Sequence, residues 1–259
     1  MHDSLADGLC RHKARELLEK LMVCAPGEID VESLAWLAGR LHIEEGGLDT
    51  AEGSLVASEK GGVIRVNHRS SPGRKRFTVA HEIGHRVVHG TSIYSDSLRQ
   101  LRQWTGDSRE REANVFAAEL LMPTHLFAPQ VHRRGASMES IRDLAALFRT
   151  SLMATEVNFV HHTRDPCALV VCNKDKVLWS VKSRDFGWFI AGGKPHEFTT
   201  AAEVLNGKRD PTDRMEKTPA GAWLENFDPG GNQYLREGCR VLRDLGQTVS
   251  LLWIDEELE

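Results

Sequence analysis

The sequence predicts an α+β fold, with a helix-rich first part that holds a small sheet and a β-rich last part. Apolar residues recur at helical spacing in segments 9–24 and 30–41. Two short β-like runs follow, at 54–57 and 63–67, and turn residues join them. From Cys167 onward β-like runs dominate and four of the six tryptophans gather, so a smaller domain with an aromatic-rich core is expected there.

Composition excludes several classes of protein. The chain has 259 residues, 41% of them hydrophobic and 27% charged, which is typical of a globular protein of one large or two modest domains. A net charge of −4 does not fit an overall basic nucleic-acid binder. There is no apolar run of membrane-spanning length and no apolar leader, and five widely spaced cysteines form no C-x-x-C pair. We therefore expect a cytoplasmic protein without a membrane partner.

The elements expected in the first part follow from periodicity and turn residues. They are helices over 9–24 and 30–41, a hairpin of strands 54–57 and 63–67, a basic loop over 69–76, and helices over 77–89 and 109–121. Pro26-Gly27, Gly90 and Met122-Pro123 end three of the helices.

Further along, residues 137–162 predict two short helices with a break near 149–151. The expected strands of the last part are 167–172, 177–182 and 248–254. This pattern predicts three regions: a domain over 1–130, a helix-turn-helix-like helical segment over 131–164, and a small aromatic-rich α/β domain of open role over 165–259.

The segment that carries chemistry is His81-Glu82-Ile83-Gly84-His85, an H-E-x-x-H pattern. Histidines four residues apart lie on one face of a helix, so both imidazoles can bind one metal ion. Glu82 is offset on the same side and can accept a proton from a water held by that ion. Three fixed positions often match by chance, but here they lie within a clear helical pattern. Gly84 costs roughly 1 kcal/mol in a helix relative to alanine, which indicates a close neighbour there.

A catalytic zinc ion usually takes a third protein ligand. The helix over 109–121 offers Glu110, Glu112 and Glu119. Glu112 and Glu119 share a face but stand about 10.5 Å apart along the axis, so one ion cannot bind both. Spacing alone leaves Glu112 and Glu119 nearly equal as candidates.

Two blocks of sequence resemble the ImmA/IrrE family of zinc metallopeptidases. They are R-F-T-V-A-H-E-I-G-H at 76–85 and E-A-N-V-F-A-A-E-L-L-M-P at 112–123. That family shows R-F-T-x-A-H-E-x-G-H, followed by E-x-x-A-N or by E-A-N-x-F-A-A-x-L-L-M-P, and the resemblance covers about residues 30–123. It implies a zincin-like peptidase core, with His81 and His85 as metal ligands, Glu82 as general base and Glu112 as the third ligand. Zinc is the expected metal, and manganese is compatible with the same donors.

The resemblance also implies a function. Members of the family cleave a helix-turn-helix repressor, so a zinc-dependent endopeptidase that relieves repression in a stress or mobile-element response is expected. The alternative is a regulatory module of peptidase fold that binds and inactivates a repressor without cutting it. Because a pure scaffold does not require a proton-accepting Glu82, the sequence favours the enzyme.

Direct binding to nucleic acid is not expected. Residues 140–151 resemble a helix-turn-helix stretch, but Arg149 stands at the turn where glycine is usual. The following helix, over 152–162, has no lysine or arginine and would gain little from phosphate contacts. A helical hairpin packed on the peptidase is therefore the expected structure of this segment.

Overall fold

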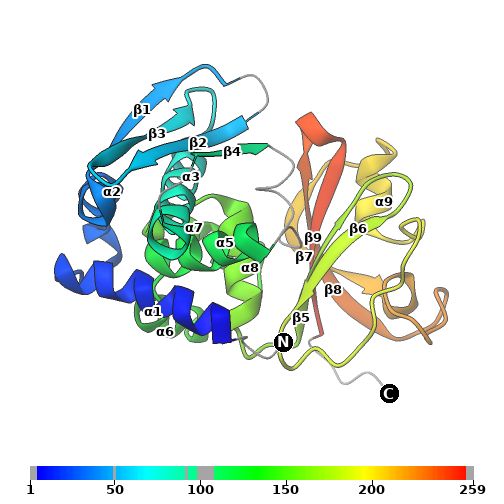
Figure 1. The fold of residues 1–259 in the computed structure, drawn as a ribbon. Coiled ribbons are helices and arrows are strands. Elements are labelled where there is room, and N and C mark those ends of the chain that lie inside the picture. Colours follow the sequence, from blue (N-terminus) through cyan, green and yellow to red (C-terminus); the bar gives the residue numbers. More distant parts are fainter. Residues whose placement is uncertain (1–4, 49–50, 91–92, 98–107, 255–259) are drawn as a thin grey trace. The chain divides into compact units, whose positions relative to one another are not determined.

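The computed structural model describes residues 5–48, 51–90, 93–97 and 108–254. The chain divides into two compact units: Met1–Phe127 with Ala145–Ala154, and Ala128–Leu144 with Thr155–Glu259 (Figure 1). The first unit combines helices with one sheet and the second is rich in strands, so the predicted α+β class is confirmed. Among the described residues, the helices are too short or too polar to cross a bilayer.

Helices make up most of the first unit and of residues 124–162, which are divided between the two units. They are α1 (Leu5–Lys20), η1 (Pro26–Glu28), α2 (Val31–Gly39), α3 (Pro72–Gly84), the π-helical turn η2 (His85–His89), α5 (Ser108–Leu121), α6 (Thr124–His132), α7 (Met138–Phe148) and α8 (Leu152–His162). α3 packs against α5, and α1 packs against the same α5. α7 and α8 form the predicted pair of helices, and between them Arg149 adopts a left-handed conformation with φ of 55°.

The sheet of the first unit lies against α3 (Figure 1). Its strand order is β1-β3-β2-β4, with bounds of Leu41–Gly46 for β1, Ala51–Ser58 for β2, Gly61–Asn67 for β3 and Ile93–Ser97 for β4. β1 runs parallel to β3, and the other pairs are antiparallel. The predicted hairpin is confirmed, because Ser58 pairs with Gly61 and leaves a two-residue loop between β2 and β3.

Several boundaries differ from the prediction, such as those of the first helix, which runs over Leu5–Lys20 instead of 9–24. Two of the differences have a clear local reason. The second helix does not reach Leu41: it ends at Gly39 because Arg40 turns left-handed, with φ of 53°, and β1 begins at once. The helix α3, which bears the H-E-x-x-H pattern, begins at Pro72 rather than Phe77. Proline fits the first helical turn after an extended Ser71, so part of the expected basic loop is helical.

The second unit contains a five-stranded antiparallel sheet in the order β6-β5-β9-β8-β7. Besides parts of α6, α7 and α8, this unit contains β5 (Cys167–Cys172), β6 (Val177–Lys182), α9 (Thr200–Leu205), β7 (Thr212–Pro219), η3 (Ala220–Ala222), β8 (Tyr234–Leu242), η4 (Arg243–Leu245) and β9 (Gln247–Trp253). Trp223 and Phe186 are buried against Val170 and Leu252, so the core combines aromatic with aliphatic side chains. The sequence did not predict β7, β8 or α9.

Candidate metal centre

The H-E-x-x-H segment lies on the most deeply buried part of α3. His81, Glu82 and His85 are each 0% exposed, in a helix whose residues from Phe77 to Gly84 are all buried. At His85 the helix passes into the π-helical turn η2. Such turns inside helices occur frequently at functional sites, because they change the direction of the side chains that follow.

Glu110 of α5 completes a cluster with the two histidines. The Nε2 atoms of His81 and His85 are 3.0 Å apart, and the Glu110 carboxylate lies 3.3 Å from the first and 3.4 Å from the second. Two nitrogen ligands of a tetrahedral zinc ion stand about 3.4 Å apart. The spacing of the donor atoms and their chemistry, two imidazoles and a carboxylate, therefore fit a zinc ion.

Asn114 orients the ring of His81 through a hydrogen bond on the side away from the cluster. Nδ1 of His81 donates to Oδ1 of Asn114 at 2.9 Å, and Asn114 is 1% exposed on α5. With its proton on Nδ1, the imidazole keeps the lone pair of Nε2 directed at the cluster. A bond of this kind fixes both the tautomer and the orientation of a metal-binding histidine.

The structure departs from the expectation that Glu112 is the third ligand. Residues 110 and 112 are separated by about 200° around the axis of α5, so they point to different sides. Oε2 of Glu112 lies 3.5 Å from Nε2 of His89, while Glu110 faces His81 and His85. The family pattern E-x-x-A-N, applied to Ala113-Asn114, puts its acidic residue at 110 and is the signal in the sequence for this position.

Glu119, the other acidic candidate, has a structural role. It is 1% exposed, and its carboxylate accepts hydrogen bonds from the backbone N–H of Thr124 at 3.2 Å and from the Thr124 hydroxyl at 2.7 Å. Nε of Arg15 donates to the same carboxylate at 2.7 Å. Glu119 therefore ties the start of α6 and the helix α1 to α5.

Gly84 allows α3 and α5 to approach closely, as its position inside a helix predicted. A Cβ atom at Gly84 would lie 3.2 Å from both Cα and the carbonyl oxygen of Ala113, and 3.1 Å from a ring carbon of Phe116. Since the donor atoms of the cluster come from both helices, this close packing brings the carboxylate of Glu110 within reach of the histidines.

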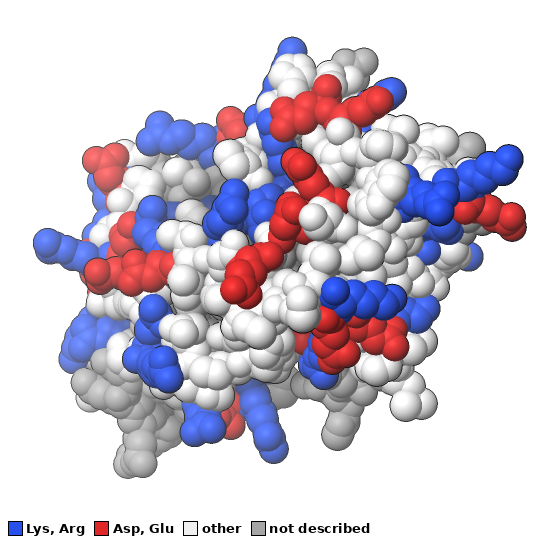
Figure 2. Space-filling view, turned by 90° about the vertical axis from the view of Figure 1, so that its left-hand side faces the viewer, with Lys and Arg blue, Asp and Glu red and all other residues white. Residues whose placement is uncertain are grey.

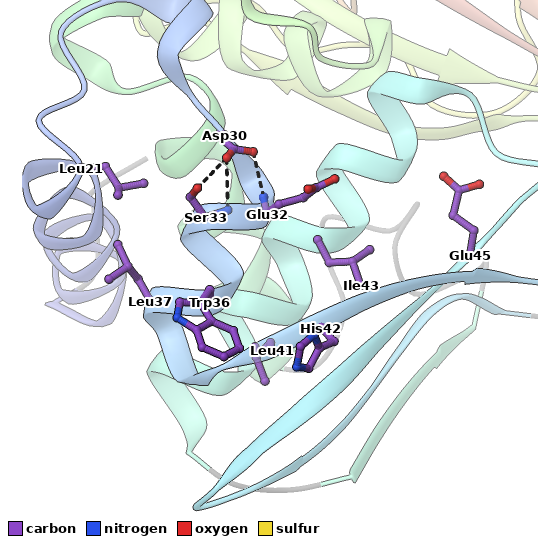
Figure 3. Close-up of a pocket in the computed structure, with 10 residues that line it drawn as sticks. All are labelled: Leu21, Asp30, Glu32, Ser33, Trp36, Leu37, Leu41, His42, Ile43 and Glu45. Atoms are coloured by element: carbon purple, nitrogen blue, oxygen red, sulfur yellow. Dashed lines mark hydrogen bonds between the residues drawn. The ribbon is translucent and has the colours of Figure 1, made fainter.

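A groove of about 730 Å³ lies elsewhere on the first unit, and none of the metal-site residues lines it (Figure 3). Asp30 borders it and caps α2, since its carboxylate accepts from the backbone N–H groups of Glu32 at 3.1 Å and Ser33 at 3.3 Å. The Ser33 hydroxyl also donates to this carboxylate, and this bond is the main cause of the lowered pKa of Asp30. The groove is thus lined mainly by α2 and β1, and no residue of the histidine–glutamate cluster lines it.

A buried H-E-x-x-H helix joined by a glutamate from a second helix is an arrangement typical of metallopeptidases. Residues 41–159 match the family model described as the IrrE N-terminal-like domain, Peptidase_M78. This part of the chain is therefore similar to the ImmA/IrrE family of metallopeptidases.

Two curated relatives are similar over the same region. The radiation response metalloprotease IrrE of Deinococcus radiodurans is 30% identical over 118 residues, which are 44% of this chain and 35% of that protein. Its namesake in Deinococcus deserti is 32% identical over 114 residues, or 42% of this chain and 40% of that protein. The match therefore spans well under half of each relative.

A solved structure is similar in fold over more of the chain. It is a Mycobacterium tuberculosis transcriptional regulator, with a TM-score of 0.60 and 15% identity. The likeness covers 98% of this chain and 76% of the regulator. At this identity the likeness concerns the fold alone.

Proposed function

We propose that this chain is a zinc-dependent endopeptidase that cleaves a helix-turn-helix transcriptional repressor. In this proposal His81, His85 and Glu110 hold the zinc ion and Glu82 is the general base. The observation that carries it is the cluster formed by the Nε2 atoms of two histidines and the carboxylate of Glu110, at 3.0–3.4 Å from one another. The buried helix α3, which bears His81, also bears Glu82.

The residues of the site would divide the chemistry of peptide hydrolysis. A zinc ion bound there supplies Lewis-acid chemistry for the attack of water on a peptide carbonyl. Glu82 accepts the proton of the attacking water and passes it to the leaving amine. His81, held by Asn114, keeps one ligand nitrogen fixed, so that no reorganisation of the imidazole is needed during the reaction.

The repressor as substrate is supported by the family and by the charge of the chain. On the face shown in Figure 2, lysine and arginine side chains are interspersed with aspartate and glutamate. The helix α8 has no lysine or arginine, and the net charge is −4. Since α8 is not a basic DNA-binding helix, a separate cytoplasmic repressor would bind the operator. This chain would cleave that repressor.

The test mixes the zinc-loaded protein with the helix-turn-helix repressor encoded beside its gene. Glu82→Gln and His85→Ala variants are the controls. Wild type should make a discrete cut, Glu82→Gln should bind zinc without cutting, and His85→Ala should lose both. A cut by Glu82→Gln at the wild-type rate would refute the role of Glu82.

Two other outcomes would overturn parts of the proposal. A stable complex that frees the operator without cleavage would establish the non-proteolytic module instead of the enzyme. The absence of both a cut and a complex would refute this repressor as the substrate. The metal content of wild type and His85→Ala, measured on the same samples, tests the zinc site independently of the substrate.

A further inference from the structure

The alternation of buried and exposed residues along β2 is lost at the start of the strand, which lies near α3. Ala51, Glu52 and Gly53 are all buried, although successive residues of a strand normally face opposite sides. The pairing with β4 shifts register between Ala51 and Gly53, which marks a β-bulge. Bulges redirect side chains and are frequent next to active sites.

Glu52 fixes this bulged segment to the start of α3. Its carboxylate lies 2.7 Å from Nε of Arg74 in the first turns of the helix, and it accepts a hydrogen bond from the hydroxyl of Ser70 just before the helix. Glu52 is only 4% exposed, so these contacts are protected from water. The strand and the helix are therefore held together close to the metal centre.

Gly53 is the residue of that strand that leaves room for the carboxylate of Glu82. A Cβ atom on Gly53 would overlap Cγ2 of Thr78 and lie 2.9 Å from Oε1 of Glu82. Its backbone is not left-handed, so the conformation alone does not require glycine. A glycine inside a strand weakens the strand, and the need here is for space beside the carboxylate of Glu82.

We infer that Gly53 is a positioning residue for Glu82: the bulged strand β2 places a residue without a side chain against the carboxylate and so defines the place that carboxylate occupies. This inference rests on the proposed function, but the contact itself can be tested without activity. Any side chain at residue 53 would displace the carboxylate, and a displacement of about 1 Å from the working geometry can cost about 100-fold in rate.

The test uses stability first. Because Thr78→Ser removes Cγ2, the Gly53→Ala change is made in that background, where the contact with Glu82 remains. Gly53→Ala should lower Tm there. Adding Glu82→Ala, which shortens the side chain, should abolish that loss, whereas the isosteric Glu82→Gln should leave it in place. An equal loss of Tm with all three residues at 82 would overturn the contact.

Activity gives the second readout. Relative to Thr78→Ser alone, Gly53→Ala/Thr78→Ser should lower kcat about 100-fold on the cleaved substrate with KM and zinc affinity unchanged. Gly46→Ala is the matched control, because this glycine lies in β1 of the same sheet and a Cβ there meets only the Arg65 side chain at 3.7 Å or more. Cleavage by the double variant at the rate of Thr78→Ser would refute the inference. If wild type itself does not cleave, the proposed function fails, and the stability cycle still decides the contact.

Discussion

Nδ1 of His81 donates a hydrogen bond of 2.9 Å to Oδ1 of Asn114, and this bond links the two helices that supply the metal-binding cluster. His81 belongs to α3, while Asn114 lies one turn beyond Glu110 on α5. The helix α5 therefore provides both Glu110, the carboxylate of the cluster, and Asn114, the residue that orients His81.

Asn114→Ala is expected to weaken zinc binding about 10–100-fold, which is the usual effect of removing an outer partner of a metal-binding histidine. Asn114→Asp keeps an acceptor for Nδ1–H of His81 and is the matched control. Zinc affinity measured by competition with a chelator checks both variants. If Asn114→Ala binds zinc as tightly as wild type, the bond does not orient the ring in solution.

Glu110→Gln and Glu112→Gln should differ in metal binding although they are two residues apart. Glu110 faces Nε2 of His81 and His85, whereas Glu112 faces His89. Removing an outer partner of a metal-binding histidine lowers metal affinity by at most roughly 100-fold. We expect Glu110→Gln to lower zinc affinity by more than that, and Glu112→Gln to bind zinc about as tightly as wild type. Zinc content after gel filtration measures this directly.

The same pair can be compared by thermal unfolding. Zinc at about 100 times its Kd should stabilise the wild type by about 2.7 kcal/mol, because it binds the folded state alone. Glu112→Gln should show the same rise in Tm and Glu110→Gln a much smaller one. The reverse order would restore Glu112 as the third ligand.

The contrast between these two glutamates shows what the sequence could and could not predict. His81 and His85 were predictable because their relation depends only on the geometry of a single helix. The choice among three glutamates of α5 depends on how that helix is rotated against α3, which local spacing does not determine. The packing at Gly84 and Ala113 sets that rotation.

The same reasoning applies to the elements that the sequence missed. β7 reads T-D-R-M-E-K-T-P and lacks the apolar alternation of a half-buried strand. β1 alternates only over Leu41–Glu44, and Leu41 also continues the helical spacing of the preceding segment. Both are edge strands that owe their conformation to one neighbour, β3 for β1 and β8 for β7. The hairpin of β2 and β3 was predictable because its turn and strands are consecutive in the chain.

Gly84→Ala should destabilise the protein by about 1–3 kcal/mol, as overpacking does, although alanine favours helices. The added Cβ would press on the backbone of Ala113 and force α3 away from α5. Gly8→Ala in α1 is the control, since nothing lies within 4 Å of a Cβ there, and it should be neutral or stabilising. Urea unfolding of both variants measures the difference. Equal stability of the two would show that the helices can separate without cost.

Glu237 is expected to be essential for the stability of the second unit. It is 0% exposed on β8. Its carboxylate accepts five hydrogen bonds, from the backbone N–H of Thr200 (2.9 Å) and Ala201 (3.0 Å), the hydroxyls of Thr218 (3.1 Å) and Ser250 (2.9 Å), and Nε1 of Trp223 (3.0 Å). These donors come from β7, β9, α9 and the segment around η3, so one side chain connects most of the unit.

Glu237→Gln should therefore cost about 3 kcal/mol or more, because the new amide group would face buried donors that lose their acceptor. Glu203→Gln on α9 is the matched control. Glu203 is 41% exposed and pairs with Arg209 at 3.2 Å, so its loss should change stability by less than about 1 kcal/mol. Urea unfolding followed by tryptophan fluorescence reports largely on the second unit, since four of the six tryptophans lie there and Trp223 donates to Glu237. Equal midpoints for the two variants would mean that the five donors find other acceptors when the carboxylate is replaced.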